Sequence, residues 1–311
     1  MAMKAAVLNA FGETPAVEDL PEPNAESGQE VVEVVAAGVN PVDLTIASGH
    51  FYGPLPTLPA AVGSEAVVRR ADGSLGYVSK AASGTLAERA MVRAGSVIEL
   101  PDGIDPAQAI AAGIAGLAAW GSLEHGGSLQ TGEKVLVLGA SGVVGQIAVQ
   151  AARVMGAGLV VGSARSQEGI EHLEGLALDA VIPTEVEDLA ERLAAVADGG
   201  FDVCVDLVYG PSLLAALGAM ASLGRIVQVG NAAAATVELP AGALRARNLS
   251  LIGYSSMRLS PDELAMTYRK VIHAFGTGDV RIEVEEFSID EVGSAWSRQA
   301  GSPHRKLIVV P

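Results

Sequence analysis

The sequence predicts an α/β protein whose central part is a doubly wound parallel sheet of six strands. Between residues 134 and 252, six short apolar runs alternate with helical segments, a pattern typical of parallel strands covered on both faces. The first run leads directly into a glycine-rich turn at the start of a helix. Residues 1–100 differ, because their short β-type runs are separated by Gly, Pro and Asn turns. We therefore expect a β-rich domain in addition to the parallel sheet.

The length of 311 residues fits two domains, and the change of pattern sets their boundaries. Residues 1–120 and 257–311 are predicted to form the β-rich domain together, and residues 121–256 the doubly wound domain. The apolar stretch 107–119 predicts a buried helix near the domain junction. A last strand at Lys306–Val310 suggests that the tail folds back onto the first domain.

The predicted strands of the sheet are rich in β-branched residues and leucine, at Val135–Leu138, Leu159–Val161, Ala180–Ile182, Val203–Leu207, Arg225–Val229 and Leu249–Ile252. Helices are predicted between the first five strands, at Gln146–Met155, Glu168–Leu176, Val186–Val196 and Pro211–Ser222. The final connection, residues 231–248, shows no clear helix. A further helix is predicted to start at the N-cap Ser260 and to stop at Gly276.

Charge and composition argue against several functional classes. The formal net charge is −16, so nucleic acid and membrane partners are not expected. No apolar run is long enough to cross a bilayer, and the first residues lack the apolar region of a signal peptide, so we expect a cytoplasmic protein. Cys204 is the only cysteine, which excludes an internal disulfide and a zinc site built from several cysteines. Its apolar surroundings predict a buried, structural thiol.

The strongest motif is the turn Gly139–Gly145, which joins the first strand of the sheet to its helix. Ala140, Gly142 and Gly145 stand at the three small-residue positions of a Rossmann dinucleotide fingerprint. We predict that Ala140 makes the tight turn, Gly142 admits a pyrophosphate, and Gly145 lets the helix pack on the strand. Because alanine replaces the first glycine, the turn is expected to be slightly wider. The helix N-terminus adds free N–H groups and partial positive charge, so the motif predicts dinucleotide binding rather than packing alone.

The end of the second predicted strand indicates which dinucleotide binds. An NAD site needs Asp or Glu about 20 residues past the turn. Here Gly162–Ser166 contains no acid, and the first one is Glu168. Arg165 can pair with a 2′-phosphate through two hydrogen bonds, and Ser163 and Ser166 can donate to it. We therefore predict NADPH as the cofactor. The alternative for Arg165 is a solvated surface arginine.

Several segments together resemble one protein family along nearly the whole chain. They are Ala36–Asp43, Gly63–Glu65, Gly84–Glu88, the turn at 139–145, Gly224–Gly230 and Lys306–Val310. The chain resembles the medium-chain dehydrogenase/reductase superfamily, specifically its zinc-independent quinone oxidoreductase branch. The resemblance implies a GroES-like catalytic domain made from both termini, with a Rossmann domain between them. It also implies a homodimer formed through strand edges near Leu249–Ile252.

The resemblance also bears on metal binding. Zinc-dependent relatives have a cysteine where this chain has Asn40 and a histidine where it has Ser64, and neither Asn nor Ser is a credible zinc ligand. The histidines are scattered and show no ligand spacing, at His50, His125, His172, His273 and His304. We therefore predict no metal site.

A metal-free site restricts the reaction. Without a Lewis acid, the substrate must spread the incoming negative charge itself. Quinones and α,β-unsaturated carbonyls do so after a hydride arrives, so we predict an NADPH-dependent quinone or enone reductase. The protein would hold the nicotinamide against the acceptor in a water-poor cleft. Two alternatives remain open: a pathway-specific enoyl reductase, and a non-catalytic NADPH-binding redox sensor.

The resemblance assigns roles to individual residues. Asn40 would help to orient the nicotinamide ribose or amide. Tyr52 is predicted to overhang the cleft and donate a proton to the acceptor oxygen, or alternatively to serve only as a packing lid. Asp43 and Glu65 are predicted as structural hydrogen-bonding partners of the cleft loops. The predicted cofactor-binding set is Asn40, Ala140, Ser141, Gly142, Val143, Val144, Ser163, Ala164, Arg165, Val208, Gly230, Asn231, Tyr254 and Ser255.

Overall fold

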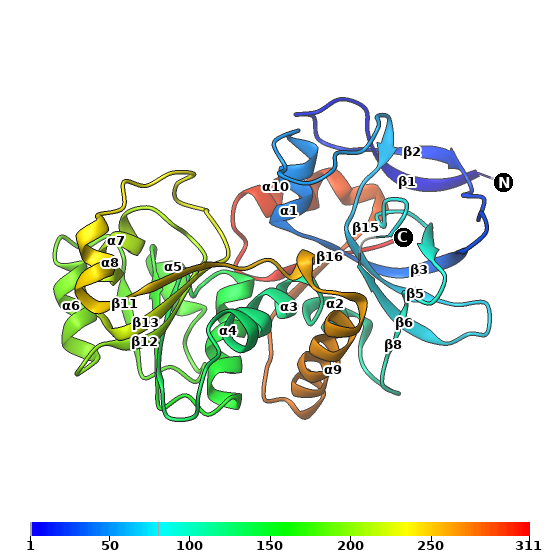
Figure 1. Cartoon of the computed structure of the whole chain (residues 1–311). Helices are drawn as coiled ribbons and strands as arrows, with labels where there is room; N and C mark the ends of the chain where they lie inside the picture. The colour runs from blue at the N-terminus through cyan, green and yellow to red at the C-terminus, as the bar shows by residue number, and fades with distance from the viewer. Residues whose placement is uncertain (1, 80) are drawn as a thin grey trace. The chain divides into compact units, whose positions relative to one another are not determined.

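The computed structural model describes residues 2–79 and 81–311, and the chain divides into two compact units (Figure 1). Unit 1 comprises Met1–Ile114 and Ile282–Pro311, and unit 2 comprises Ala115–Arg281. Unit 2 holds a six-stranded parallel sheet, whereas the strands of unit 1 are mainly antiparallel. The predicted α/β class, with a doubly wound sheet and a separate β-rich domain, is confirmed.

The sheet of unit 2 has the strand order β11-β10-β9-β12-β13-β14, and every pair runs parallel. All six predicted strands are present, as β9 (Lys134–Leu138), β10 (Leu159–Ala164), β11 (Ala180–Pro183), β12 (Phe201–Asp206), β13 (Met220–Gln228) and β14 (Ser250–Gly253). The order reverses between β9 and β12, the point at which this fold binds its ligands. The glycine-rich turn follows β9 and therefore lies at this point.

Helices cover both faces of the sheet. The helices of unit 2 are α3 (Ile114–Gly121), α4 (Val143–Val154), α5 (Gln167–Glu171), α6 (Leu189–Val196), α7 (Pro211–Leu217), α8 (Ala241–Arg247) and α9 (Pro261–Thr277), with the short π-helix η1 (Ser122–Gly126) and the 3-10 helix η2 (Ser256–Arg258). Apolar side chains of α6, α7 and α8 pack on one face, and α4 lies on the other side (Figure 1).

The helices differ from their predicted extents where local packing decides. The stretch 107–119 is two helices, α2 (Pro106–Ala111) and α3, because the chain turns at Gly113. The connection 231–248 does contain a helix, α8, whose two turns are too short to show a clear period. Helix α9 has Ser260 as its N-cap but runs past Gly276 to Gly278, where the left-handed φ of +79° ends it.

Unit 1 is built on a seven-stranded sheet and a smaller sheet of three strands. The larger has the order β15-β16-β3-β5-β6-β8, with β7 also paired to β3, and the smaller is β2-β1-β4. The strands are β1 (Ala2–Leu8), β2 (Ala16–Pro21), β3 (Gln29–Val39), β4 (Ala60–Ala61), β5 (Glu65–Arg69), β6 (Leu75–Ser79), β7 (Arg89–Arg93), β8 (Ile98–Glu99), β15 (Val284–Ser288) and β16 (Lys306–Val310). The helices are α1 (Pro41–Ala47), α2, η3 (Ile289–Glu291) and α10 (Val292–Ala300).

The tail returns to the first domain as the sequence suggested. Strand β16 pairs antiparallel with β3, so that Leu307 lies opposite Val39. Leu307 and Val309 then join the apolar core of unit 1, which also contains Trp296 of α10. This pairing places Lys306, the first residue of β16, beside the end of β3.

The second domain boundary lies at Arg281 rather than after residue 256, so α9 belongs to unit 2. The Thr267 hydroxyl of α9 is 3.1 Å from His125 Nε2, which fixes the helix to η1. Gln150 of α4 binds both backbone groups of Arg281, with distances of 3.1 Å to its N–H and 2.9 Å to its C=O. No helix among residues 2–79 and 81–311 is both long and apolar enough to span a membrane.

Candidate cofactor and catalytic site

The tight turn after β9 is made by Gly139 and not, as predicted, by Ala140. Gly139 has a left-handed φ of +80°, which a residue with a Cβ rarely adopts. The Ala140 N–H donates to the Ser163 carbonyl at 2.8 Å, which ties the turn to β10. Ala140 itself is fully buried, so its predicted contact with a cofactor is not supported. Its methyl group instead packs close to Gly162, where an added Cβ would come within 2.8 Å.

The start of α4 offers room and hydrogen-bond donors for a phosphate group. Gly142 is the N-cap and no side chain caps the helix, so the N–H groups of its first turn, from Val143 onward, have no partner within the helix. A Cβ at Gly142 would meet nothing closer than Gly139 O at 3.7 Å. A Cβ at Gly145 would lie 2.6 Å from Ala140 Cα, so only glycine lets the helix sit against the turn. These residues fit the diphosphate of a dinucleotide.

The end of β10 presents one exposed cation. Arg165 is exposed and forms no hydrogen bond or ion pair with any residue that the structure describes. Ala164 is buried, and Ser166 caps α5 by accepting from the Gly169 N–H at 3.1 Å. Ser163 is fully buried, and its hydroxyl has no partner within the described part of the chain. The predicted donation from Ser163 to a 2′-phosphate is therefore not supported, whereas Arg165 is available.

The ends of β12 and β13 bring Val208, Gly230 and Asn231 to the same edge of the sheet. Asp206, which sequence reasoning missed, organises this edge. Its Oδ1 accepts from Val208 N–H at 3.1 Å, and its carbonyl accepts from Gly230 N–H at 3.2 Å. Burial raises the pKa of this carboxyl group. An acid that closes an apolar strand is a signal that could have identified it.

The side chain of Tyr254 contacts helix α3 within unit 2. Its hydroxyl lies 3.4 Å from the Leu117 carbonyl, and a Cβ at Gly121 would overlap the hydroxyl oxygen. Burial raises the pKa of Tyr254 to about 12. The contact of Tyr254 with the nicotinamide half of the cofactor stays a prediction. Ser255 follows it, half-buried, at the start of η2, and Ser141 is buried in the glycine-rich turn.

In unit 1, the side chains of Asn40, Asp43, Ser64, Glu65, Tyr77 and Lys306 form one polar network, which we call the buried centre. Glu65 is 0% exposed and accepts four hydrogen bonds. The donors are Asn40 Nδ2 at 2.9 Å, Lys306 Nζ at 2.7 Å, Tyr77 Oη at 2.9 Å and Ile114 N at 2.6 Å. Glu65 therefore has its structural role, joining β5, β6, β16 and the start of α3.

Asn40 has no polar atom left for a cofactor. Its Oδ1 accepts from Lys306 Nζ at 2.5 Å, its Nδ2 donates to Glu65, and its backbone N–H donates to Asp43 Oδ2 at 2.8 Å. The side chain is only 3% exposed. The predicted direct role of Asn40 in binding the nicotinamide or in catalysis is therefore not supported. Its position at the N-cap of α1 makes it a residue that holds the buried centre together.

The buried centre does not fit zinc. Asn40 and Ser64 are not zinc ligands, and the Glu65 carboxylate is bound to the Lys306 ammonium. Among residues 2–79 and 81–311, no group of three or more His, Cys, Asp or Glu side chains is arranged to hold a metal. Lys306 was missed as a site residue by sequence reasoning, although a lysine that opens an apolar terminal strand is an unusual choice for a buried position.

Tyr52 lies on the surface of unit 1. It is 71% exposed, and its ring packs against Phe51 with the centroids 4.5 Å apart. The role of Tyr52 as a proton donor stays a prediction.

The pH dependence of folding provides a test of the buried centre. Burial raises the pKa of Asp43 to about 6, although hydrogen bonds from Ser64 and Asn40 act in the opposite direction. An unfolded aspartate has a pKa of about 3.9, so between about pH 4 and pH 6 the folded protein keeps a proton that the unfolded chain has released. The free energy of unfolding should therefore decrease as the pH rises from about 4 to about 6, by up to about 3 kcal/mol. Asp43→Asn should remove this component of the slope in urea unfolding measured from pH 4 to 7, and an unchanged slope would contradict the assignment.

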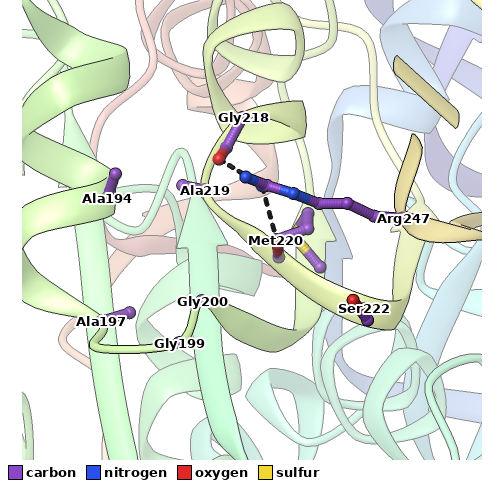
Figure 2. Close-up of a pocket in the computed structure, with 9 residues that line it drawn as sticks. All are labelled: Ala194, Ala197, Gly199, Gly200, Gly218, Ala219, Met220, Ser222 and Arg247. Carbon is purple, nitrogen blue, oxygen red and sulfur yellow. Dashed lines mark hydrogen bonds between the residues drawn. The ribbon is translucent and has the colours of Figure 1, made fainter. Parts of the chain in front are cut away.

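A pocket of about 270 Å³ lies elsewhere in unit 2 (Figure 2). Small residues around the starts of β12 and β13 line it, and the Arg247 guanidinium donates to the carbonyls of Gly218 and Met220. Because the strands are parallel, this is the opposite edge of the sheet from the glycine-rich turn. None of the predicted site residues lines this pocket.

Comparison with known proteins agrees with this architecture. Residues 143–275 match the family model of zinc-binding dehydrogenases. The quinone oxidoreductase of Homo sapiens is 32% identical over 256 residues, which cover 79% of this chain and 77% of the relative. The chain belongs to the quinone oxidoreductase branch of the medium-chain dehydrogenase/reductase superfamily. Membership makes it an oxidoreductase.

Two further proteins are similar to this chain over most of its length. The crystal structure of the Thermus thermophilus quinone oxidoreductase has a TM-score of 0.84 and 30% identity, and the match covers 99% of this chain and 100% of that one. A mycocerosic acid synthase-like polyketide synthase from Mycolicibacterium smegmatis is 29% identical over 302 residues. That match covers 91% of this chain but 14% of the synthase.

Proposed function

We propose that this protein is an NADPH-dependent reductase that transfers a hydride to a quinone or an α,β-unsaturated carbonyl. The observation that carries the proposal is the uncapped N-terminus of α4, with Gly142 leaving space in front of it and the exposed Arg165 at the end of the next strand. The helix end suits a diphosphate and the guanidinium suits a 2′-phosphate. The Thermus thermophilus relative has been crystallised in complex with NADPH, which supports this choice of cofactor.

The chemistry divides between the cofactor, the acceptor and the chain. When bound, NADPH supplies the hydride. The chain holds the diphosphate at α4, and Asp206 keeps Val208 and Gly230 in place at the same edge of the sheet. Because the buried centre does not fit zinc, we infer that the acceptor delocalises the incoming charge itself. Tyr52, which is 71% exposed as a residue, is the candidate that supplies a proton to the reduced acceptor.

Arg165→Ala tests the cofactor assignment. Loss of a charged, bidentate hydrogen-bonding partner should weaken NADPH binding by about 10- to 100-fold. Binding of NADH, which has no 2′-phosphate, should change by less than about threefold. Isothermal titration of both nucleotides measures this difference, with Arg192→Ala as a control for removing another exposed arginine of unit 2. Equal losses for the two nucleotides would refute the role of Arg165.

An acceptor panel tests the reaction itself. Steady NADPH oxidation with small quinones or enones supports the proposal. Turnover of an enoyl thioester with no turnover of quinones would instead favour a pathway-specific enoyl reductase, a candidate supported by the match to the polyketide synthase over 91% of this chain. Tight NADPH binding without turnover of any acceptor would favour a redox sensor.

A further inference from the structure

Two polar side chains lie on the buried side of α4. Gln146 is 4% exposed and Gln150 is 5% exposed, whereas the other buried residues of this helix are apolar or glycine. A buried amide is unfavourable unless its polar atoms find hydrogen-bonding partners. Because the two glutamines are four residues apart, they lie on one line along the helix, and this line begins at the N-cap Gly142.

Gln146 connects the helix to the glycine-rich turn. Its Nε2 donates to the Ser141 carbonyl at 2.7 Å. The N–H of the same peptide group, which belongs to Gly142, donates to the Gly139 carbonyl at 3.3 Å. Both polar atoms of this peptide are therefore bound, and the peptide that leads into the first turn of α4 has a fixed orientation. The N–H groups proposed to bind the diphosphate start at the next residue, Val143.

Gln150 connects the same helix to the end of unit 2. Its Nε2 donates to the Gln146 carbonyl and to the Arg281 carbonyl, each at 2.9 Å, and its Oε1 accepts from the Arg281 N–H at 3.1 Å. The Arg281 guanidinium also donates to the Gly175 carbonyl at 3.1 Å. Arg281 is the last residue of unit 2, and the chain passes from there into unit 1. A series of hydrogen bonds, which we call the glutamine ladder, therefore runs through the two glutamine side chains from the Ser141 carbonyl to Arg281.

We propose that Gln146 and Gln150 are positioning residues that couple nucleotide binding at the glycine-rich turn to the hydrogen bonds of Arg281. A diphosphate at the start of α4 favours the turn geometry that Gln146 fixes, and the same helix position lets Gln150 bind the Arg281 backbone. Such coupling is reciprocal, so loss of the hydrogen bonds to Arg281 weakens nucleotide binding by the factor by which the nucleotide strengthens them. The proposal rests on the proposed function, because it requires the nucleotide to bind at this turn. It adds that an occupied cofactor site stabilises the point at which the chain leaves unit 2.

A double-mutant cycle on NADPH affinity tests the glutamine ladder. Methionine is similar in length to glutamine and has no amide, so Gln146→Met removes the contact with the Ser141 carbonyl and should weaken NADPH binding by about tenfold. Gln150→Met, about two turns into the helix, should weaken it by about threefold. If the two side chains act as one unit, the double variant should lose no more than about tenfold, whereas independent losses would multiply to about 30-fold. Isothermal titration with NADPH measures all four proteins, after urea unfolding has shown that each is folded.

Gln130→Met is the matched control. Gln130 is an exposed glutamine of the same unit, and its Nε2 donates to the Ser128 carbonyl at 2.7 Å. Its replacement should leave the NADPH affinity unchanged to within about twofold. A 30-fold loss in the double variant, or wild-type affinity in Gln150→Met, would overturn this proposal alone. A wild-type protein that bound no NADPH would refute the proposed function, and this proposal with it.

Hydrogen exchange of the wild-type protein provides a second test. The Arg281 N–H donates to Gln150 Oε1, so its exchange rate reports how often that hydrogen bond opens. Saturating NADPH should slow the exchange of this amide by at least about fivefold, the lower end of the usual range for coupled sites. NMR detection of the Arg281 amide with and without NADPH measures the change. An unchanged rate with NADPH bound would overturn the proposal, even if the glutamine variants did not fold.

Discussion

Gly145→Ala should destabilise unit 2 by about 3 kcal/mol and abolish cofactor binding, because the added methyl group would press on backbone and not on a movable side chain. Its Cβ would lie 2.6 Å from Ala140 Cα, and it would also overlap the Gly139 carbonyl. This steric overlap can be removed only if α4 moves away from the turn after β9. The N–H groups of its first turn would then no longer point at the same place. Urea unfolding and NADPH titration measure the two effects.

Gly142→Ala, three residues earlier, is the matched control. Its Cβ would meet no protein atom closer than 3.7 Å, so the loss of stability should stay below about 1 kcal/mol, the usual cost of alanine at an N-cap. The methyl group would nevertheless occupy the space in front of the helix, and NADPH binding should weaken by at least about tenfold. Equal losses of stability in the two variants would contradict the packing argument for Gly145. Normal NADPH binding by Gly142→Ala would mean that the phosphate does not lie at this helix end.

These two glycines illustrate what the sequence could predict. The order strand, glycine-rich turn, helix is local, so the pattern of residues 135–155 was sufficient to place β9, the turn and α4. The six parallel strands were predictable for the same reason, because each is a short apolar run bounded by turns. The assignment of the tight turn to Ala140 was wrong, because the left-handed φ falls one residue earlier, at Gly139.

Site residues that depend on tertiary contacts were not predictable. Tyr254 was assigned to the nicotinamide because it follows the sixth strand, and the contact of its hydroxyl with the Leu117 carbonyl of α3, more than a hundred residues away in sequence, could not be foreseen. Ser163 is a similar case. It was predicted correctly at the end of β10, but the sequence did not show that its side chain is buried. Arg165 projects from the surface, and exposed residues at strand ends are the ones for which sequence position suffices.

Lys306 and Glu65 were missed as a pair because 241 residues separate them. Nothing local to either position indicates the other. The ammonium reaches the carboxylate only because the tail returns as β16 beside β3. The sequence predicted this return of the tail but not the ion pair that results from it. The second domain boundary was predicted at the wrong residue for a similar reason. The Gln150 side chain hydrogen-bonds to the Arg281 backbone, and these two residues are 131 positions apart.

A double-mutant cycle on this pair should give the largest effect on folding. Glu65→Gln removes the carboxylate that accepts directly from the buried Lys306 ammonium, and Lys306→Met leaves the Glu65 carboxylate buried without its cation, so each should lower the free energy of unfolding by about 3–5 kcal/mol. The double variant removes both charges and should lose at least about 2 kcal/mol less than the sum of the single variants. Urea unfolding of the four proteins at pH 7 measures the coupling. The exposed pair Lys4–Asp290 of the same unit is the control, and it should show no measurable coupling because water screens it. Additive losses at Glu65 and Lys306 would mean that the two side chains stabilise unit 1 through packing and not through the pairing of their opposite charges.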